Sequence, residues 1–261
     1  MAITEKSPAQ PVALRIPDPQ RRNKFFYGKL MDAYHFELET KYLNAKRWLL
    51  NGFVSGTGVV CGLDVKEGKQ DNEIIITAGL AIDKWGREIM VPVPTPSIPI
   101  PAKLIQEAAT RGKSNPDDCF VHVLISYKES EGEPTPVFAS QCGGDPPCSA
   151  GAIIEGYSVE FMAGSVPQTK TDCAFPEAAS PGVIDYPALA TWVTRKKRCL
   201  TFSSDPRIPL ANIPVAKGGE RCHCGPEHID IGIRPIVFSN RLLFDLLLCL
   251  EAEGQGSDSR A

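Results

Sequence analysis

Glycine and proline set the strongest limit on what this chain can fold into. Its 261 residues include 22 glycines and 23 prolines. Proline fixes φ and lacks a backbone donor, and both residue types are favoured in turns. The sequence therefore predicts many turns and short elements rather than a fold of long helices.

Two stretches depart from this pattern and predict helices. In the first, apolar and aromatic residues recur at three- and four-residue spacing, as on one helical face: Met31, His35, Leu38, Tyr42, Ala45 and Leu49. Asp32 is expected to cap its start and Gly52 to end it. The second stretch covers residues 240–253, and its apolar face holds Leu242, Leu243, Leu246, Leu247 and Leu250.

Apolar and alternating runs between the two helices predict strands. They cover residues 59–66, 73–78, 88–93, 119–129, 152–164 and 230–239. Gly86 is expected to supply a positive φ in a tight turn. Shorter helical stretches are expected near 102–110 and 186–199, and a loop is expected over residues 130–150.

These elements predict an α+β fold. Its core is expected to be β-rich, sandwich- or barrel-like and mostly antiparallel, with a long N-terminal helix, a C-terminal helix and a cysteine-rich irregular segment. No internal repeat or linker divides residues 21–252, so we expect one structural domain, with the cysteine-rich segment at 140–225. Residues 1–20 are expected to form a disordered or docking arm, and residues 253–261 a disordered tail.

Charge and hydropathy argue against several classes of protein. The net charge of -3 creates no field that would favour nucleic acid or an acidic membrane. No run of about 18 apolar residues is present, so no membrane insertion is expected. The first 20 residues lack the apolar core of a signal peptide, which predicts synthesis in the cytoplasm without classical secretion.

The cysteines suggest a metal site. There are nine, an odd number that cannot form a complete set of intrachain disulfides. Cys222 and Cys224 lie in the stretch RCHCGPEH, and thiolates with imidazole suit tetrahedral zinc. We expect a structural zinc held by Cys142, Cys148, Cys222 and Cys224. His223 and His228 are possible substitutes as ligands, and the participation of Cys173 or Cys199 stays open, as do disulfides and free thiols.

A catalytic interpretation has less support. A zinc-dependent hydrolase would need an open metal position and a placed base, and Glu220 and Glu227 only flank the cysteine pair. Neither His-Glu-X-X-His nor Gly-X-Ser-X-Gly occurs. Cys61 lies in an apolar run and is expected in the core. His35 and His122 are expected to be packed, hydrogen-bonded histidines.

Four basic and three aromatic residues are mixed in a short stretch just before the first helix. Arg22, Phe25, Phe26 and Tyr27 lie in the stretch RRNKFFYGK. Such a stretch can bind nucleic acid by stacking and charge. No wider basic stripe accompanies it, so we expect these four residues to anchor a protein partner instead.

Several short motifs together resemble a family found in gene clusters for contractile injection systems, the phage-tail-like particles that bacteria build. The motifs are Asn23, Phe26–Lys29, Phe36–Glu39, Gly58–Leu63, Gly79–Asp83 and Gly86–Glu88. The stretches CGGDPPCSAGAIIEGYSVEF and RPIVFSNRLLFDLL are also similar. The resemblance touches much of the chain from Arg21 to Leu247 and is most specific in the first third.

The resemblance implies a non-enzymatic structural component, at the baseplate or caging the spike. Its partners would be baseplate, spike or sheath proteins and copies of itself in a three-fold or six-fold homo-oligomer, since assemblies in such tails follow the particle's symmetry. The particle would be released or membrane-docked. The alternatives are the zinc hydrolase and a surface-binding module at the particle tip, for which Trp85 and Trp192 are the suggestive side chains.

Overall fold

A computed structural model describes residues 21–70, 72–114, 119–136, 148–168, 179–180, 183–196, 203–214 and 229–257 of the chain. Its contacts divide the chain into two compact units, the first made of residues up to Arg47 with Lys170–Ser204, the second of Trp48–Thr169 with Asp205 onward. The sequence predicts one domain over residues 21–252. In the first unit only Asn23 and Ala45 are buried among the described side chains, so this unit has little apolar core of its own.

The first unit holds helix α1 (Ala33–Leu50), whose last turn passes into the second unit, and four short elements. These are β9 (Ala179–Ser180), β10 (Val183–Ile184), α3 (Tyr186–Thr191) and the π-helical turn η3 (Trp192–Lys196). Asp185 caps α3 by accepting a hydrogen bond from the Ala188 amide at 3.0 Å. The helical stretch expected near 186–199 is thus present as far as Lys196.

Helix α1 confirms the long N-terminal helix, and its start is the expected one. The Asp32 carboxylate accepts a hydrogen bond from the His35 amide at 3.2 Å, as an N-capping side chain does. Its end differs from the prediction. The chain passes Gly52 in a π-helical turn, η1 (Asn51–Ser55), and leaves the helix at Gly56, whose φ is 89°. Asn51 fixes this turn by donating from its side chain to Gly86 O at 2.9 Å and to Glu88 Oε1 at 2.8 Å.

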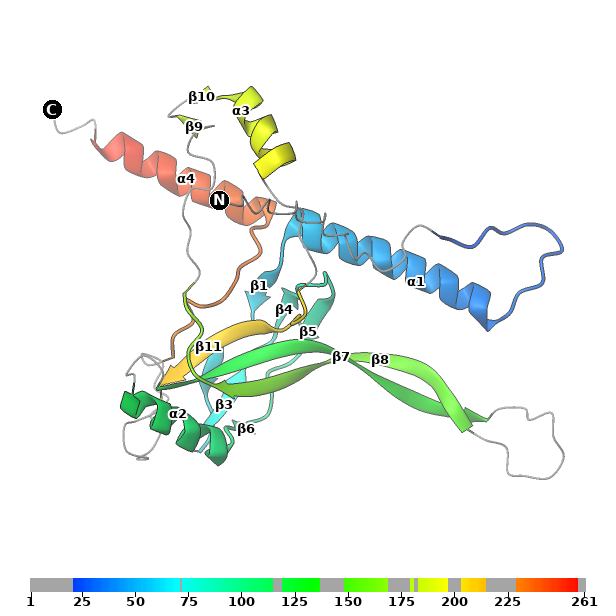
Figure 1. The fold of residues 1–261 in the computed structure, drawn as a ribbon, viewed down its shortest axis with the longest axis horizontal. Coiled ribbons are helices and arrows are strands. Elements are labelled where there is room, and N and C mark those ends of the chain that lie inside the picture. The colour runs from blue at the N-terminus through cyan, green and yellow to red at the C-terminus, as the bar shows by residue number, and fades with distance from the viewer. Residues whose placement is uncertain are drawn as a thin grey trace, which may run out of the picture. The chain divides into compact units, whose positions relative to one another are not determined.

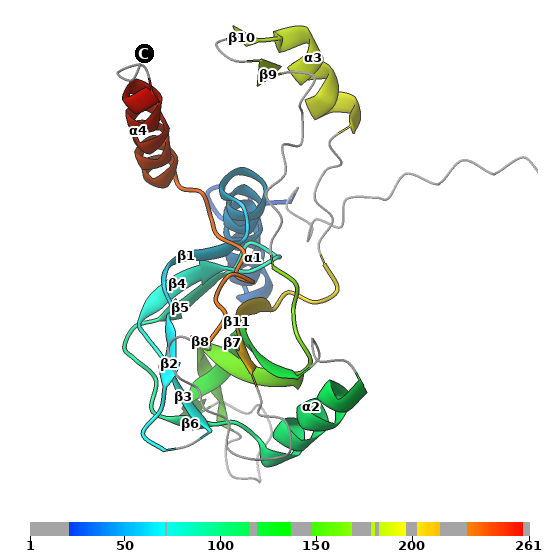
Figure 2. The same ribbon diagram turned by 90° about the vertical axis from the view of Figure 1, so that its left-hand side faces the viewer.

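The second unit is built on three three-stranded antiparallel sheets (Figures 1 and 2). The first has the order β1 (Gly58–Gly62), β4 (Gly79–Ile82), β5 (Glu88–Val91). The second has the order β2 (Val65–Glu67), β3 (Glu73–Ile76), β6 (Ile98–Pro99). The third has the order β11 (Ile208–Pro214), β7 (Phe120–Pro136), β8 (Cys148–Ala163). Helix α2 (Ala102–Ser114) packs on β7 and β8, and α4 (Asn240–Ser257) ends the described chain.

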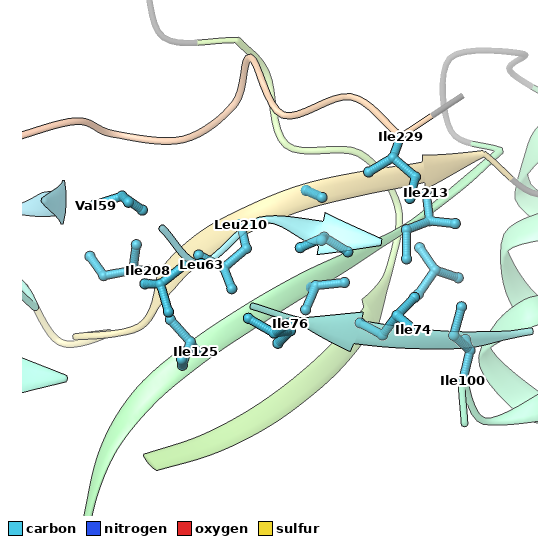
Figure 3. Close-up of a cluster of buried hydrophobic side chains, with 14 of the residues drawn as sticks. Val59, Leu63, Ile74, Ile76, Ile100, Ile125, Ile208, Leu210, Ile213 and Ile229 are labelled. Atoms are coloured by element: carbon cyan, nitrogen blue, oxygen red, sulfur yellow. The ribbon is translucent and has the colours of Figure 1, made fainter. Parts of the chain in front are cut away.

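One apolar core joins the three sheets, which confirms an α+β fold with a β-rich core. Figure 3 shows isoleucine and leucine side chains from β3, β7 and β11 gathered in one cluster with Val59 of β1. The side chains of Leu63, Ile76, Ile125, Ile208 and Leu210 are fully buried. At about 1.5–3 kcal/mol for each buried side chain of this size, burial here dominates the stability of the unit.

The strand expected over 59–66 is broken in two. Leu63 has a φ of 56°, which is unusual for a leucine, and it separates β1 and β2, which belong to different sheets. The break lets the Leu63 side chain enter the core, where it is fully buried. Non-local packing therefore outweighs the local preference for one continuous strand.

Other boundaries also differ from the expected ones. Strand β7 continues to Pro136 and β8 begins at Cys148, so part of the expected 130–150 loop is a hairpin. Strand β11 lies within the segment expected to be irregular, and β4 and β6 were not expected. The expected 230–239 strand forms only isolated bridges, Asn212 with Asp230 and Val59 with Ile236. Helix α4 reaches Ser257, past the start of the expected tail at residue 253.

Candidate interaction surfaces

The expected zinc ligands lie almost entirely outside the described residues. These are Cys142, Cys222 and Cys224, with the substitutes His223 and His228 and the further candidates Cys173 and Cys199. Cys148 is described by its backbone, which opens β8 opposite Pro136. Over the described ranges, no three histidine, cysteine, aspartate or glutamate side chains are grouped as a metal would require. The zinc site stays a prediction.

The other cysteines and the histidines are placed by the sheets. Cys61 is exposed at the end of β1, so the expectation that it lies in the core is wrong. The strand's regular alternation breaks between Val59 and Cys61, where the pairing with β4 shifts register. His122 is buried and its Nδ1 lies 2.7 Å from Gly164 O, which confirms a packed, hydrogen-bonded histidine. His35 is partly exposed and contacts Asp32.

A tight polar cluster of the second unit surrounds Asp83, which is fully buried. Its Oδ1 accepts hydrogen bonds from the Trp85 and Arg87 amides at 2.8 and 2.9 Å, and its Oδ2 accepts from Arg87 Nε at 2.7 Å. The Arg87 guanidinium lies between the rings of Trp85 and Tyr127, at 4.5 and 4.8 Å from their centroids. Every partner therefore holds the β4–β5 turn in shape, and Trp85 acts as a packing surface for Arg87.

Gly86 completes this turn as expected. Its φ is 83°, and a Cβ built there would lie 1.9 Å from Trp48 O. Both the backbone conformation and the close approach of the helix end require glycine at this position. The same turn contacts Asn51 of η1, so the end of α1 is fixed to the first sheet.

An open cavity of about 590 Å³ lies at the edge of the second sheet, lined by Asp64, Lys66, Glu67 and Ile231 among others. Arg234 lies beside it, with Nη2 3.9 Å from Asp64 Oδ1. Burial lowers the pKa of Arg234, and the charge of Asp64 opposes that shift. The wall carries charges of both signs, which selects no single class of ligand.

The expected partner anchors are exposed. Phe25 and Phe26 are each 63% exposed and Tyr27 is fully exposed, and Arg22 is exposed as well. A turn closed by the Lys29 amide on Phe26 O at 3.2 Å presents them. The buried Asn23 anchors that turn, because its backbone N–H donates a hydrogen bond to Glu39 Oε2 on α1 at 3.2 Å. The three aromatic side chains are thus exposed on a turn that is held to α1.

Both long helices also expose apolar side chains. On α1 the expected face is the less exposed one, while Phe36, Leu43 and Leu50 are all more than half exposed. Their seven-residue spacing places them along one side of the helix. On α4 the exposed large apolar side chains are Leu243, Phe244, Leu246, Leu247 and Leu248. Monomeric proteins seldom expose large contiguous apolar patches, and such patches mark surfaces that meet a partner.

The hairpin of β7 and β8 is a surface that the sequence did not predict. Its exposed side chains include Glu129, Glu131, Ile153, Ile154 and Glu155. The apolar alternation of the inner strand ends at Tyr127, because residues 128–131 are all polar. The glutamates and Gly132 favoured a loop, since both residue types are depleted in strands.

No helix within the described ranges combines the length and the apolar character needed to cross a bilayer. Comparison with protein-family models and with curated proteins finds no match to this chain.

Proposed function

We propose that this chain is a structural assembly component of a contractile injection particle, positioned at the baseplate or caging the spike, and that it has no enzymatic role. Its partners are copies of itself in a three-fold or six-fold ring, together with baseplate, spike or sheath proteins. It is made in the cytoplasm and built into a particle that is released or membrane-docked.

The exposed apolar side chains of α1 and α4 carry this proposal. Phe36, Leu43 and Leu50 on α1 are 62%, 57% and 56% exposed, and Phe244 and Leu247 on α4 are 52% and 60% exposed. Helices with such sides are stable in water when another surface covers them. An assembly protein meets that condition, because each copy is covered by its neighbours in the particle.

The resemblance of the first third of the chain to injection-system proteins supports the same proposal. Several of the resembling residues have architectural roles in the structure. Asp83 and Arg87 hold the β4–β5 turn, and Gly86 permits the contact with Trp48. Asn23 anchors the aromatic turn. A motif made of turn-forming and packing residues fits a structural protein better than a catalyst.

A structural zinc bound by Cys142, Cys148, Cys222 and Cys224 is part of the proposal. It would pin the cysteine-rich segment, as closed four-ligand zinc sites do in small domains. Metal analysis of the purified chain, with thiols counted before and after chelation, tests it. We expect close to one zinc per chain and a gain of titratable thiols on chelation. A metal-free chain with every thiol titratable would exclude the site.

Imaging of particles from cells that lack this chain tests the assembly role. We expect particles with an incomplete baseplate or an uncovered spike, restored when the chain is supplied again. In a matched experiment, the cells receive a Phe36→Ser, Leu43→Ser variant in place of the unchanged chain. This variant should fold and fail to join the particle. Particles of normal shape and composition in the absence of the chain would contradict the proposal.

A further inference from the structure

The outer half of the β7–β8 hairpin lacks a third strand. Strand β11 pairs with β7 only from Phe120 to Ile125. Beyond that point β7 pairs with β8 alone as far as Pro136, and Figure 1 shows the two strands continuing as a ribbon past the end of β11. Two-stranded ribbons are marginally stable in water without further packing, so this one gains stability from any surface that covers it.

One face of this ribbon combines negative charge with an apolar side chain. Glu129 lies directly opposite Glu155, and Glu131 opposite Ile153. Directly paired residues share a face, so three carboxylates and Ile153, which is 68% exposed, lie together. Across the described residues, none of these three carboxylates forms an ion pair with lysine or arginine.

The pairing of Glu129 with Glu155 is unfavourable in the isolated chain. Like charges directly opposite each other destabilise a strand pair. The Tyr127 hydroxyl donates to Glu129 Oε1 at 2.8 Å, which satisfies one acceptor and brings no positive charge. Burial and these two carboxylates raise the pKa of Tyr127, so the tyrosine stays neutral. A cation from outside the hairpin would turn this repulsion into attraction.

The segment Arg22–Leu30 has the complementary character. Arg22 and Lys24 are exposed, as are Phe25, Phe26 and Leu30, the last at 88%. Basic and apolar side chains therefore lie within a few residues of one another, around a turn that Asn23 holds in place. Arginine forms forked, charge-assisted hydrogen bonds with carboxylates, and aromatic rings are efficient covers for an exposed isoleucine.

We propose that Arg22–Leu30 of one copy docks on the Glu129, Glu131 and Glu155 face of the hairpin of a second copy. This inference rests on the proposed function, because it supplies the contact between copies. Each copy carries one donor segment and one receptor face. The contact is therefore head-to-tail, and repetition closes it into a ring when the rotation permits.

Two charge-reversed variants of the full chain test the contact. The arm variant carries Arg22→Glu and Lys24→Glu, and the hairpin variant carries Glu131→Lys and Glu155→Lys. Each alone places like charges against each other between copies, so we expect association to weaken about a hundredfold, as unfavourable charge pairs at interfaces do. An equimolar mixture restores opposite charges at every contact and should associate again, in assemblies with an even number of subunits.

Sedimentation velocity of each variant, of the mixture and of the unchanged chain gives the readout. A control with Lys69→Glu and Lys103→Glu makes the same change in net charge as the arm variant, on exposed lysines elsewhere, and should associate normally. Circular dichroism checks that each variant folds. The hairpin variant is expected to fold, because Glu155→Lys replaces a repulsion with Glu129 on the paired strand by an attraction.

Three results would overturn the contact. Variants that associate like the unchanged chain would assign the interface to other surfaces. Variants that dissociate singly and show no binding to each other when mixed would show that the segment and the hairpin do not meet between copies. An unchanged chain that stays monomeric at high concentration would exclude a second copy as the occupant. None of these removes the assembly role, which fails only when particles form normally without the chain.

Discussion

The two halves of β7 share one strand and one partner but have opposite surroundings. In the inner half, Val121, Val123 and Ile125 are fully buried between β8 and β11. In the outer half, Glu129, Glu131 and Glu133 are exposed. Both halves pair with β8 in one register, which is interrupted in the outer half at Glu133, where φ is 53°. The difference indicates that the inner half supplies stability, while the outer half is an extension whose side chains are available for recognition.

The largest expected effect comes from truncating the inner half. Ile125→Ala removes a fully buried side chain and leaves a cavity between three strands, so we expect the free energy of unfolding to fall by about 4 kcal/mol. Urea denaturation followed by tryptophan fluorescence measures it. In the outer half, Glu131→Ala should change this free energy by no more than about 0.5 kcal/mol. Equal losses at both positions would refute the division of the strand.

A second comparison uses charge. Asp83→Asn leaves the mostly buried Arg87 guanidinium without its charge partner, so we expect the free energy of unfolding to fall by about 3 kcal/mol. The matched control is Asp245→Asn, because Asp245 pairs with Arg241 on the exposed side of α4 and such a pair contributes about 0.3–0.5 kcal/mol. The same urea titrations report both. A small effect at Asp83 would show that Arg87 finds other acceptors.

A third comparison uses two glycines with positive φ. Gly86→Ala brings a Cβ against the Trp48 carbonyl, whereas a Cβ at Gly28 meets nothing within 4 Å. Both changes strain the backbone by about 1 kcal/mol, so we expect a loss of about 2 kcal/mol or more only at Gly86, where the neighbouring backbone must also move. Thermal denaturation of the two variants measures the difference. Equal shifts in melting temperature would mean that φ alone matters.

The smallest expected effect is a pH dependence at the edge of the third sheet. Arg207 binds Asp205 through Nε and Nη2 at 2.9 Å, and these bonds lower the pKa of Asp205 from 3.8 to about 2. Because the pKa of Asp205 is lower in the folded state, its carboxylate stabilises the folded state fully above pH 3.8. This contribution to the free energy of unfolding is lost as the pH falls through about 2. The carboxylate is 46% exposed, so the contribution is below about 1 kcal/mol.

Arg207→Gln should return the pKa of Asp205 toward 3.8 and flatten the acid side of the stability profile. Carboxyl titration by NMR measures the pKa directly. Arg241→Gln on α4 serves as the control and should leave the titration of Asp205 unchanged. A titration midpoint that stays near 2 in the Arg207 variant would assign the shift to another group.

The sequence predicted the elements whose energetics are local. Helix α1 with its Asp32 cap, the Gly86 turn, α2, and the inner half of β7 all follow from spacing, capping and turn chemistry. The candidate anchors Arg22, Phe25, Phe26 and Tyr27 are exposed, as an interface requires, and their role as an interface stays a prediction. The expected zinc ligands lie outside the described residues or, for Cys148, are described by backbone alone.

What the tertiary structure alone decided depends on contacts between distant segments. Strand β11 contains Pro209 and ends at Pro214, which locally disfavour a strand, yet pairing with β7 and burial of Ile208, Leu210 and Ile213 outweigh that preference. Leu63 adopts a positive φ for the same reason. The face of Glu129, Glu131 and Glu155 exists only because β8 brings residue 155 opposite residue 129. Sequence spacing fixes which residues share a helix or a turn, whereas register between strands, and so the surface they present, is set by the energy of the packed core.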